Sequence, residues 1–244
     1  MPRKLRQFEI GDIYHIVNRG VDKRDIFLKN QDYSRFILGL EFFNSDKPVD
    51  IWTFIERAVG GSDHPTALLA KRLEGERGKL KNPIVELLAF ALMPNHYHLI
   101  LREIKSGGIS FFMKKIGGYS TYFNKQYKRT GSLFQSRYKS IKIEDDGQLA
   151  TIFAYVHTNP VELVEQGWKD LKVENFENAV SFLENYRWSS YGDYIGKPAF
   201  PIVSSRQFFT DFFNQEKGCK QVVEDWIKFK AQNTKSIDFK KVFE

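Results

Sequence analysis

The sequence predicts an α+β fold: a mainly antiparallel sheet of the ferredoxin-like type with helices on one face. Two observations predict it. Segments dense in Ile, Val, Leu and Tyr alternate with segments whose apolar residues recur every three or four positions. These segments come in the order strand, helix, two strands, helix, strand, helix. After this domain, residues 1–170, we expect residues 171–244 to form a mainly helical extension that packs on it.

The first elements are a strand and a helix. Residues 12–18 combine Ile, Tyr and Val and are followed by the turn signal Arg19-Gly20. Residues 31–44 carry apolar side chains at helical spacing before a polar stretch with a proline ends the run. Residues 57–83 are rich in glycine and charge. We expect them to be an exposed insertion with one short helix over residues 66–74.

The central elements return the chain to the sheet. Residues 84–93 and 96–101 predict two antiparallel strands joined by a tight turn at Pro94-Asn95. Residues 108–128 show apolar positions at i, i+3, i+4 and i+7, which predicts one long helix, weakened by a Gly-Gly pair. Residues 137–143 alternate with period two, as expected for a further strand.

A second long helix follows this strand. Asp145 can cap its start, and Gln148, three residues on, can complete a capping box. The helix should end near Asn159, because Pro160 pushes its predecessor away from the α region. A last helix is expected around residues 221–230.

Composition narrows the class of partner and compartment. The 244 residues carry a formal charge of +7 and a pI of about 9.3, which favours an anionic partner such as nucleic acid. One cysteine, Cys219, excludes a disulfide within the chain and any multi-cysteine metal site, as is typical of a reducing cytoplasm. Without an apolar segment of about 18 residues, we expect no membrane contact.

The first candidate site is His96-Tyr97-His98 on the strand after Pro94-Asn95. Side chains at i and i+2 of a strand leave the same face, so both imidazoles can reach one divalent cation. A third ligand must then be a carboxylate or an amide, and such a set suits Mg²⁺ or Mn²⁺ better than structural zinc. The alternative is that the two histidines are ordinary polar residues of a half-exposed strand.

The second candidate site is Tyr155 with Asn159, one helical turn apart. A helix laid over the sheet could present this phenol and this amide to the same cation, so that a tyrosine attacks a metal-held phosphate. Alternatively Tyr155 is a core aromatic residue and Asn159 a helix-end residue before proline. His157 points away from this face, and we interpret it as a surface or packing residue.

The third feature is a basic stretch, residues 105–143, with nine Lys and Arg residues and no Asp or Glu. A solvated basic face is one reading. The absence of acids over this length favours a surface that follows phosphates, with some aromatic side chains free to stack on unpaired bases. The candidate DNA-binding residues are Lys114, Lys115, Lys125, Lys128, Arg129, Arg137 and Lys139.

Several motifs resemble the single-tyrosine HUH transposases, in particular the REP-associated tyrosine transposases of bacteria. In chain order they are YHIVNRG, ALMPNHYHLIL, YKRTGSLFQSRYKSIKIEDD, AYVHTNPVE and YRWSSYGDYIG, within residues 8–196. The resemblance implies that His96 and His98 are metal ligands, that Tyr155 is the nucleophile and that Asn159 is a third, amide ligand. Two departures are the long insertion and the lack of a basic residue after Val161.

The resemblance also implies an activity. We expect metal-dependent cleavage and joining of single-stranded DNA through a 5′-phosphotyrosine intermediate, with Mg²⁺ or Mn²⁺, on hairpin-forming repetitive elements. The protein would be a monomer or homodimer in the bacterial cytoplasm, associated with the nucleoid. The alternatives are a non-catalytic hairpin-binding regulator derived from a transposase and a metal hydrolase that activates water.

Overall fold

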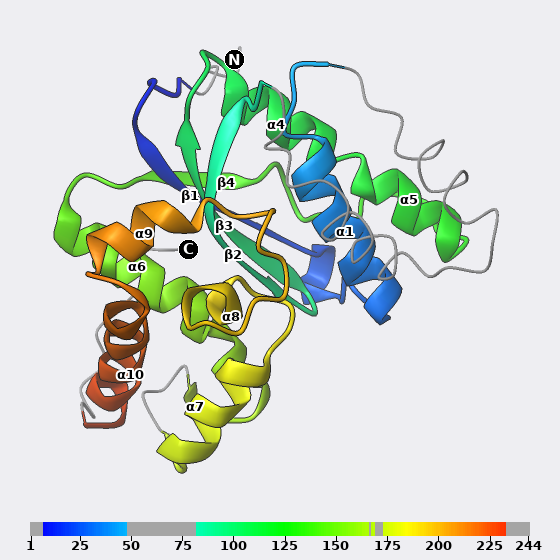
Figure 1. Ribbon diagram of the computed structural model, residues 1–244. Coiled ribbons are helices and arrows are strands. Elements are labelled where there is room, and N and C mark those ends of the chain that lie inside the picture. The colour runs from blue at the N-terminus through cyan, green and yellow to red at the C-terminus, as the bar shows by residue number, and fades with distance from the viewer. Residues whose placement is uncertain (1–6, 48–81, 166, 169–172, 233–244) are drawn as a thin grey trace.

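The computed structural model describes residues 7–47, 82–165, 167–168 and 173–232 (Figure 1). Its centre is a four-stranded sheet in the order β2-β3-β1-β4, with every neighbouring pair antiparallel. The strands are β1 (Ile13–Arg19), β2 (Val85–Met93), β3 (His96–Glu103) and β4 (Lys139–Lys142). This order and direction confirm the predicted α+β class and its ferredoxin-like sheet.

Three helices cover the first face of the sheet: α1 (Asn30–Phe42), α4 (Gly108–Ile116) and α5 (Tyr119–Gln126). They share one core cluster with sheet residues such as Tyr14, Ile16 and Leu99. The single helix predicted over residues 108–128 is in fact two helices, α4 and α5. They separate at Gly117-Gly118, because glycine has a low helix propensity and gives a kink little resistance.

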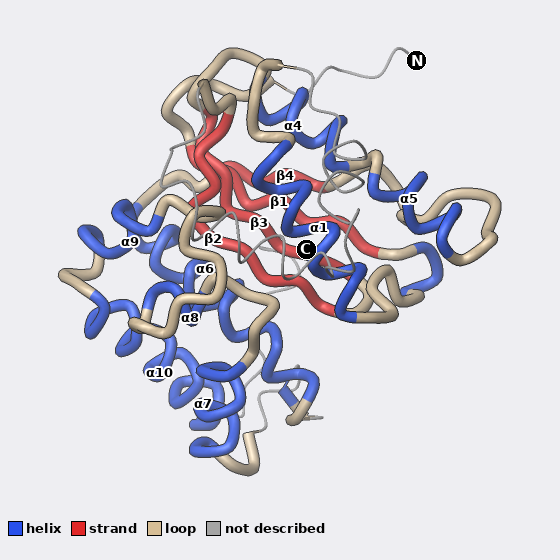
Figure 2. Tube along the Cα trace, turned by 45° about the vertical axis from the view of Figure 1, so that its right-hand side comes forward, coloured by secondary structure: helices blue, strands red, loops and turns tan. Residues whose placement is uncertain are grey.

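The opposite face is covered by α6 (Asp146–Thr158), α7 (Phe176–Asn185), α8 (Tyr191–Tyr194), α9 (Arg206–Phe212) and α10 (Glu216–Gln232). Figures 1 and 2 show the two helical layers on either side of the sheet. The prediction of helices on one face was therefore wrong. The cause is visible in β2, where Leu88, Ala89 and Ala91 are fully buried in the second core cluster. A near-continuous apolar strand indicates a sheet covered on both faces.

Helix α6 carries the predicted N-cap. The Asp145 carboxylate accepts a hydrogen bond from the Gln148 backbone N–H at 2.8 Å, which satisfies a donor of the first turn. The Gln148 side chain accepts instead from the Glu144 N–H at 3.1 Å, one residue before the expected partner. At its other end α6 continues into a 3₁₀ turn, Asn159–Leu163, which has Pro160 in its first turn.

The segment at residues 188–190 joins the C-terminal layer to the sheet. It pairs with the edge of β2: Leu92 N–H donates to the Trp188 carbonyl and Ser190 N–H to the Phe90 carbonyl, both at 2.9 Å. The Ser190 hydroxyl also lies 2.8 Å from His157 Nε2 of α6 and accepts from the Phe90 N–H at 2.9 Å. His157 is fully buried, so of the two expected roles, surface or packing, it has the second.

Two sequence-based expectations concern other parts of the chain. Most of the predicted insertion, with its short helix over residues 66–74, lies outside the described residues. In the part of the chain that the structure describes, no helix has both the length and the apolar character needed to cross a bilayer.

Candidate active site

His96 and His98 lie on β3 and face α6. The strand register places His98 opposite Val17 on one side and Ala91 on the other, and Ala91 belongs to the core cluster beneath α6. The two imidazoles therefore share the face that the i, i+2 spacing predicted, and their ring centroids lie 4.9 Å apart. Both side chains are buried, with exposed fractions of 3% and 0%, so the half-exposed strand reading does not hold.

The Nδ1 atom of each histidine has a neighbour that can fix its proton. His96 Nδ1 lies 2.6 Å from Asn95 Oδ1, and an amide oxygen can only accept. His96 Nδ1 therefore donates, which leaves the lone pair on Nε2. His98 Nδ1 lies 2.8 Å from His15 Nε2. If His98 Nδ1 donates to His15 Nε2, the lone pair of His98 is on Nε2 as well. Metal-binding histidines are oriented by partners of this kind.

His15 on β1 is a site residue that sequence reasoning missed. Its ring stacks on that of His98 at 5.1 Å between centroids, and complete burial lowers its pKa to about 3, so it is neutral. Its Nδ1 makes no hydrogen bond to any residue within the described ranges. The available signal was a lone histidine within the apolar run Ile13–Val17, two residues from Val17 on the same face.

Tyr155 lies on α6 above these histidines. Its ring meets that of His98 edge-on at 5.5 Å and that of His15 at 6.1 Å. The residue packs against the second core cluster but stays partly exposed, unlike its neighbours Ala154 and Val156. The structure thus brings the candidate nucleophile on α6 to the candidate metal ligands on β3, although about 60 residues separate them in the sequence.

Asn159 follows the last turn of α6. It is buried, and its side-chain amide N–H donates to the Tyr155 carbonyl at 2.8 Å, which leaves Oδ1 as the acceptor of the group. Among the described residues, no group of three or more His, Cys, Asp and Glu side chains is arranged to hold a metal ion. A third protein ligand beside the histidine pair would therefore be of another type, and an amide oxygen is such a ligand.

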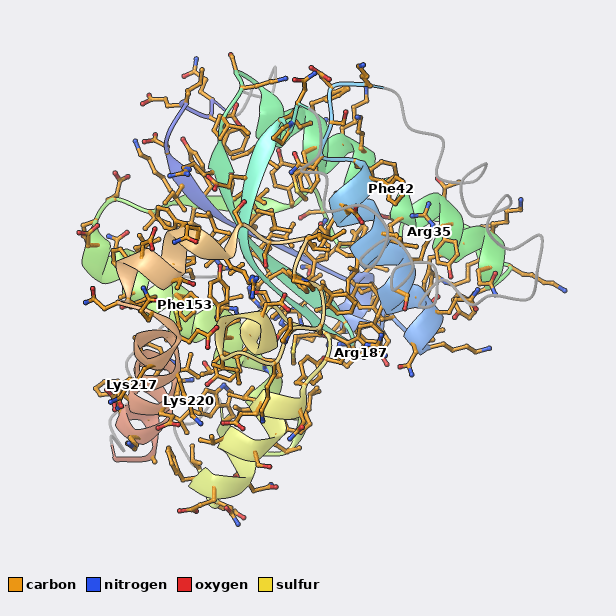
Figure 3. All side chains as sticks on the ribbon, in the orientation of Figure 1. Arg35, Phe42, Phe153, Arg187, Lys217 and Lys220 are labelled. Atoms are coloured by element: carbon orange, nitrogen blue, oxygen red, sulfur yellow. The ribbon has the colours of Figure 1, made fainter. Side chains whose placement is uncertain are left out.

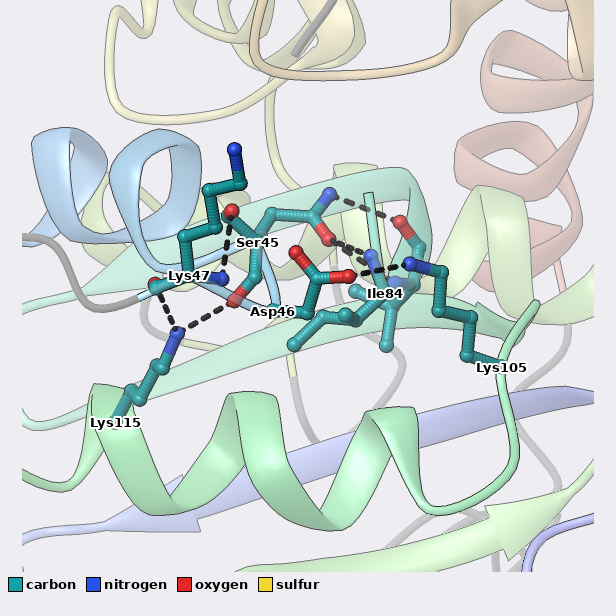
Figure 4. A network of polar contacts seen from close by, with 8 residues as sticks. Ser45, Asp46, Lys47, Ile84, Lys105 and Lys115 are labelled. Atoms are coloured by element: carbon teal, nitrogen blue, oxygen red, sulfur yellow. Dashed lines mark hydrogen bonds and ion pairs between the residues drawn. The ribbon is translucent and has the colours of Figure 1, made fainter. Parts of the chain in front are cut away.

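The basic residues on α4 and α5 occupy the other side of the sheet from Tyr155. Lys114 and Lys125 are exposed there. Lys115 is instead tied to the chain that follows α1: its ammonium donates to the carbonyls of Ser45 at 2.5 Å and Lys47 at 3.3 Å (Figure 4). Partial burial lowers the pKa of Lys115. The Lys115 ammonium is thus held by hydrogen bonds to backbone carbonyls of the protein itself.

The remaining candidates lie between α5 and the end of the sheet. Lys128 and Arg137 are exposed, whereas Arg129 donates to the Asn124 side chain at 3.2 Å and covers a phenylalanine ring. Lys139 begins β4 and pairs with Val17. The register therefore places Lys139 on the same face of the sheet as the histidine pair.

Most aromatic residues of the basic stretch hold the fold together. The Tyr119 hydroxyl donates to the Ile26 carbonyl at 2.6 Å, and those of Tyr122 and Tyr127 donate to the Asp32 carboxylate at 3.0 and 2.7 Å. Burial raises the pKa of the tyrosines in this group. These three side chains are not free to stack on bases, because they form the core between α1 and α5.

Part of the chain is similar to a known family of proteins. Residues 76–159 match the model of IS200-like transposases, which covers about a third of the chain and includes both histidines, Tyr155 and Asn159. The resemblance seen in the sequence is confirmed over that part. No curated protein matches the chain. A solved REP-associated tyrosine transposase, bound to a REP hairpin, shows 15% identity and a TM-score of 0.46, over 84% of this chain and 92% of that one.

Proposed function

We propose that this protein cleaves and rejoins single-stranded DNA through a covalent bond to Tyr155. One observation carries the proposal: a partly exposed phenol lies 5.5 Å, ring to ring, from a buried histidine that shares its strand face with a second. The match to the IS200-like transposases over residues 76–159 supports the same reading.

His96 and His98, with Asn159, are the residues that would hold a divalent ion, Mg²⁺ or Mn²⁺. The donor set fits, because each imidazole has Nδ1 beside a hydrogen-bond partner and can offer Nε2, and Asn159 can offer Oδ1. When bound, the ion supplies Lewis-acid polarisation of a phosphate oxygen.

Tyr155 performs the covalent step. Its phenolic oxygen attacks the scissile phosphorus and loses its proton to solvent, and the bond from phosphorus to the 3′ oxygen breaks. The 3′ oxygen takes up a proton and becomes a free hydroxyl, while the 5′-phosphate stays on the tyrosine. Because one phosphoester replaces another, a 3′-hydroxyl of a second strand can attack the phosphotyrosine and reverse the sequence. No nucleotide cofactor is required.

The substrate we propose is DNA with a hairpin next to an unpaired strand, as in repetitive palindromic elements. This part rests on the sequence motifs, from YHIVNRG to YRWSSYGDYIG. Lys139 and Arg137 would contact the strand near Tyr155. The exposed cations Lys114, Lys125 and Lys128, together with Arg129, would contact DNA outside the cleaved strand, because α4 and α5 lie across the sheet. Lys115, tied to two carbonyls, is the candidate we expect to contribute least.

The decisive experiment is denaturing gel electrophoresis of the protein after incubation with labelled single-stranded hairpins and Mn²⁺. Wild-type protein should give an SDS-resistant protein–DNA adduct, and Tyr155→Phe should bind the same DNA without forming it. Tyr138→Phe is the matched control, because this half-buried tyrosine packs against the other core cluster and should keep the adduct.

Two outcomes would contradict the proposal. An adduct that persists in Tyr155→Phe would assign the nucleophile to another residue. Tight hairpin binding by wild-type protein that never yields an adduct with Mg²⁺ or Mn²⁺ would favour a non-catalytic regulator instead.

A further inference from the structure

A small pocket opens beside the histidine pair, on the side of β4. Its volume is about 210 Å³, and three basic residues contribute to its walls: Arg19, Lys23 and Lys139. Such a volume lies below the range of sites for drug-sized ligands, which start at roughly 300 Å³. The pocket is therefore suited to a small group or to one segment of a longer chain.

The strand register places this pocket directly next to the candidate metal ligands. Arg19 pairs with His96 and Val17 with His98 across β1 and β3, and Lys139 pairs with Val17 across β1 and β4. Directly opposed residues of antiparallel strands have Cβ atoms about 4.5–5.5 Å apart. The pocket wall thus continues the surface that carries the histidines, without an intervening strand.

The chemistry of the lining favours an anion with further polar groups. None of the lining residues is acidic, and beside the cations they include two amides and one hydroxyl, those of Asn18, Gln135 and Ser136. Cations recognise phosphate oxygens, and side-chain amides and hydroxyls can bind phosphate, sugar or a base edge. Val17 is the one apolar residue of the lining, so an apolar ligand would leave the amides unmatched.

The turn that carries Lys23 is held in an uncommon backbone conformation. Asp22 and Lys23 both have positive φ, 55° and 58°, which non-glycine residues rarely adopt in succession. Gly20 precedes them because a Cβ there would lie 2.2 Å from the Arg24 carbonyl oxygen. Strain of this kind persists only where the surroundings fix it, and it is concentrated at ligand sites.

One residue fixes this turn to the candidate metal ligand. The Asn95 side-chain amide donates to the Lys23 carbonyl at 3.2 Å, and its oxygen lies 2.6 Å from His96 Nδ1. The Asn95 backbone carbonyl also accepts from the Gly20 N–H at 2.8 Å. The pocket and His96 are therefore parts of one connected unit rather than independent surface features.

We propose that this pocket binds the phosphate of the nucleotide next to the scissile phosphate on the single strand. The inference rests on the proposed function, since it takes the ligand to be DNA. Arg19, Lys23 and Lys139 hold the phosphate, and Gln135 and Asn18 provide hydrogen bonds to the rest of that nucleotide. The pocket thereby sets which phosphate of the strand lies beneath Tyr155.

The test measures binding without cleavage. Fluorescein-labelled oligothymidylate is titrated with Tyr155→Phe protein in the absence of divalent cations, at several NaCl concentrations. Each lost phosphate contact lowers the slope of log affinity against log salt by about 0.7 for a single strand. Lys23→Gln should lower it by about 0.7, and Lys23→Gln with Lys139→Gln by about 1.4.

Lys217→Gln is the control, because it removes the same charge from an exposed lysine of α10 that does not line the pocket (Figure 3). Its slope should equal that of the parent. An unchanged slope in the double variant, an equal loss in the control, or no binding of oligothymidylate at low salt would overturn the proposal. Displacement of the oligonucleotide by equimolar thymidine monophosphate would also overturn it, by assigning the pocket to a free nucleotide.

The outcome is separable from that of the proposed function. If wild-type protein never forms an adduct but the slopes fall as expected, the pocket stands and the cleavage proposal fails. If the adduct forms while the slopes stay unchanged, the reverse conclusion holds.

Discussion

His15 Nε2 and His98 Nδ1 lie 2.8 Å apart across β1 and β3, inside the sheet face that α6 covers. Both rings are buried and nearly parallel, with an interplanar angle of 8°. Since burial keeps His15 neutral, the pair shares one proton along this contact, and its position decides which nitrogen of His98 carries the lone pair. His15 thereby acts as a positioning residue for a candidate metal ligand.

Replacement of His15 should therefore weaken metal use more than DNA binding. In His15→Ala, His98 loses the partner of Nδ1, and loss of such a partner typically costs 10–100-fold in metal affinity or activity. We expect the Mn²⁺ concentration for half-maximal adduct formation to rise by roughly that factor. His15→Gln, whose amide oxygen can accept from His98, should recover part of the loss. An unchanged Mn²⁺ midpoint in His15→Ala would contradict the positioning role.

The candidate metal ligands should differ in their sensitivity to substitution. His96→Ala or His98→Ala should abolish the adduct, while EDTA treatment of wild-type protein should do so reversibly, with recovery on addition of Mn²⁺. Asn159→Ala should have a milder effect, because a water can replace a neutral amide oxygen. Adduct yield against Mn²⁺ concentration measures all three. Full activity of either histidine variant, or of EDTA-treated protein, would exclude this metal site.

Ser190 should contribute to stability out of proportion to its size. Its hydroxyl accepts from the Phe90 N–H and contacts His157, so Ser190→Ala leaves two buried polar groups unsatisfied. Each such group costs about 1–3 kcal/mol. We expect a fall of at least about 2 kcal/mol in the free energy of unfolding, measured by urea denaturation. Ser181→Ala, at an exposed position of α7, should stay within about 0.5 kcal/mol of wild type.

Cys219 should report the opening of the C-terminal layer. The thiol is fully buried and 3.6 Å from the Phe209 carbonyl, and burial raises its pKa to about 12. The only cysteine of the chain should thus resist thiol reagents in the native state and react on unfolding. Reaction with Ellman's reagent, with and without urea, measures this. Rapid labelling of native protein would show that α9 and α10 open readily.

The same raised pKa gives a direction for pH dependence. The unfolded thiol loses its proton near its ordinary pKa of about 8.5, whereas the folded thiol keeps it to about pH 12. This contribution to stability is fully present below about pH 8.5 and is lost as the pH rises above it. The stability advantage of wild type over Cys219→Ala should therefore shrink between pH 8.5 and 10. A constant difference would contradict the assignment.

Local patterns predicted much of the sheet and its helices. The Ile, Tyr and Val content of β1, the apolar runs around Pro94-Asn95 and the alternation over residues 137–143 identified the strands, since side-chain pattern in a strand is a local property. Helices α7, α8 and α9 were not identified individually, because they are short and their burial depends on β2 and α6, which are distant in sequence. Propensity over a few residues cannot show such contacts.

In the candidate site, too, some residues could be found from local sequence patterns and others only from the fold. His96 and His98 follow from i, i+2 spacing, and Tyr155 with Asn159 from i, i+4 spacing. His15 and Arg19 join them only through the register of β1 on β3, about 80 residues away along the chain. Conversely, composition does not reveal the buried acceptor of Tyr122 and Tyr127, Asp32, because it lies on another helix.

Helix α6 lies between β2 and α10. The order in which the chain is synthesised therefore affects when the layer behind Tyr155 can form. Phe153 and Val156 of α6 share a core cluster with Val223 and Ile227 near the end of the chain (Figure 3 labels Phe153). Because synthesis runs from the N-terminus, the histidines and Tyr155 are made before α10, the helix that packs against α6. Incomplete chains, such as those from ribosome stalling after residue 200, would carry the reactive tyrosine on a helix without its backing layer. The layer behind Tyr155 can therefore form only after α10 has been synthesised.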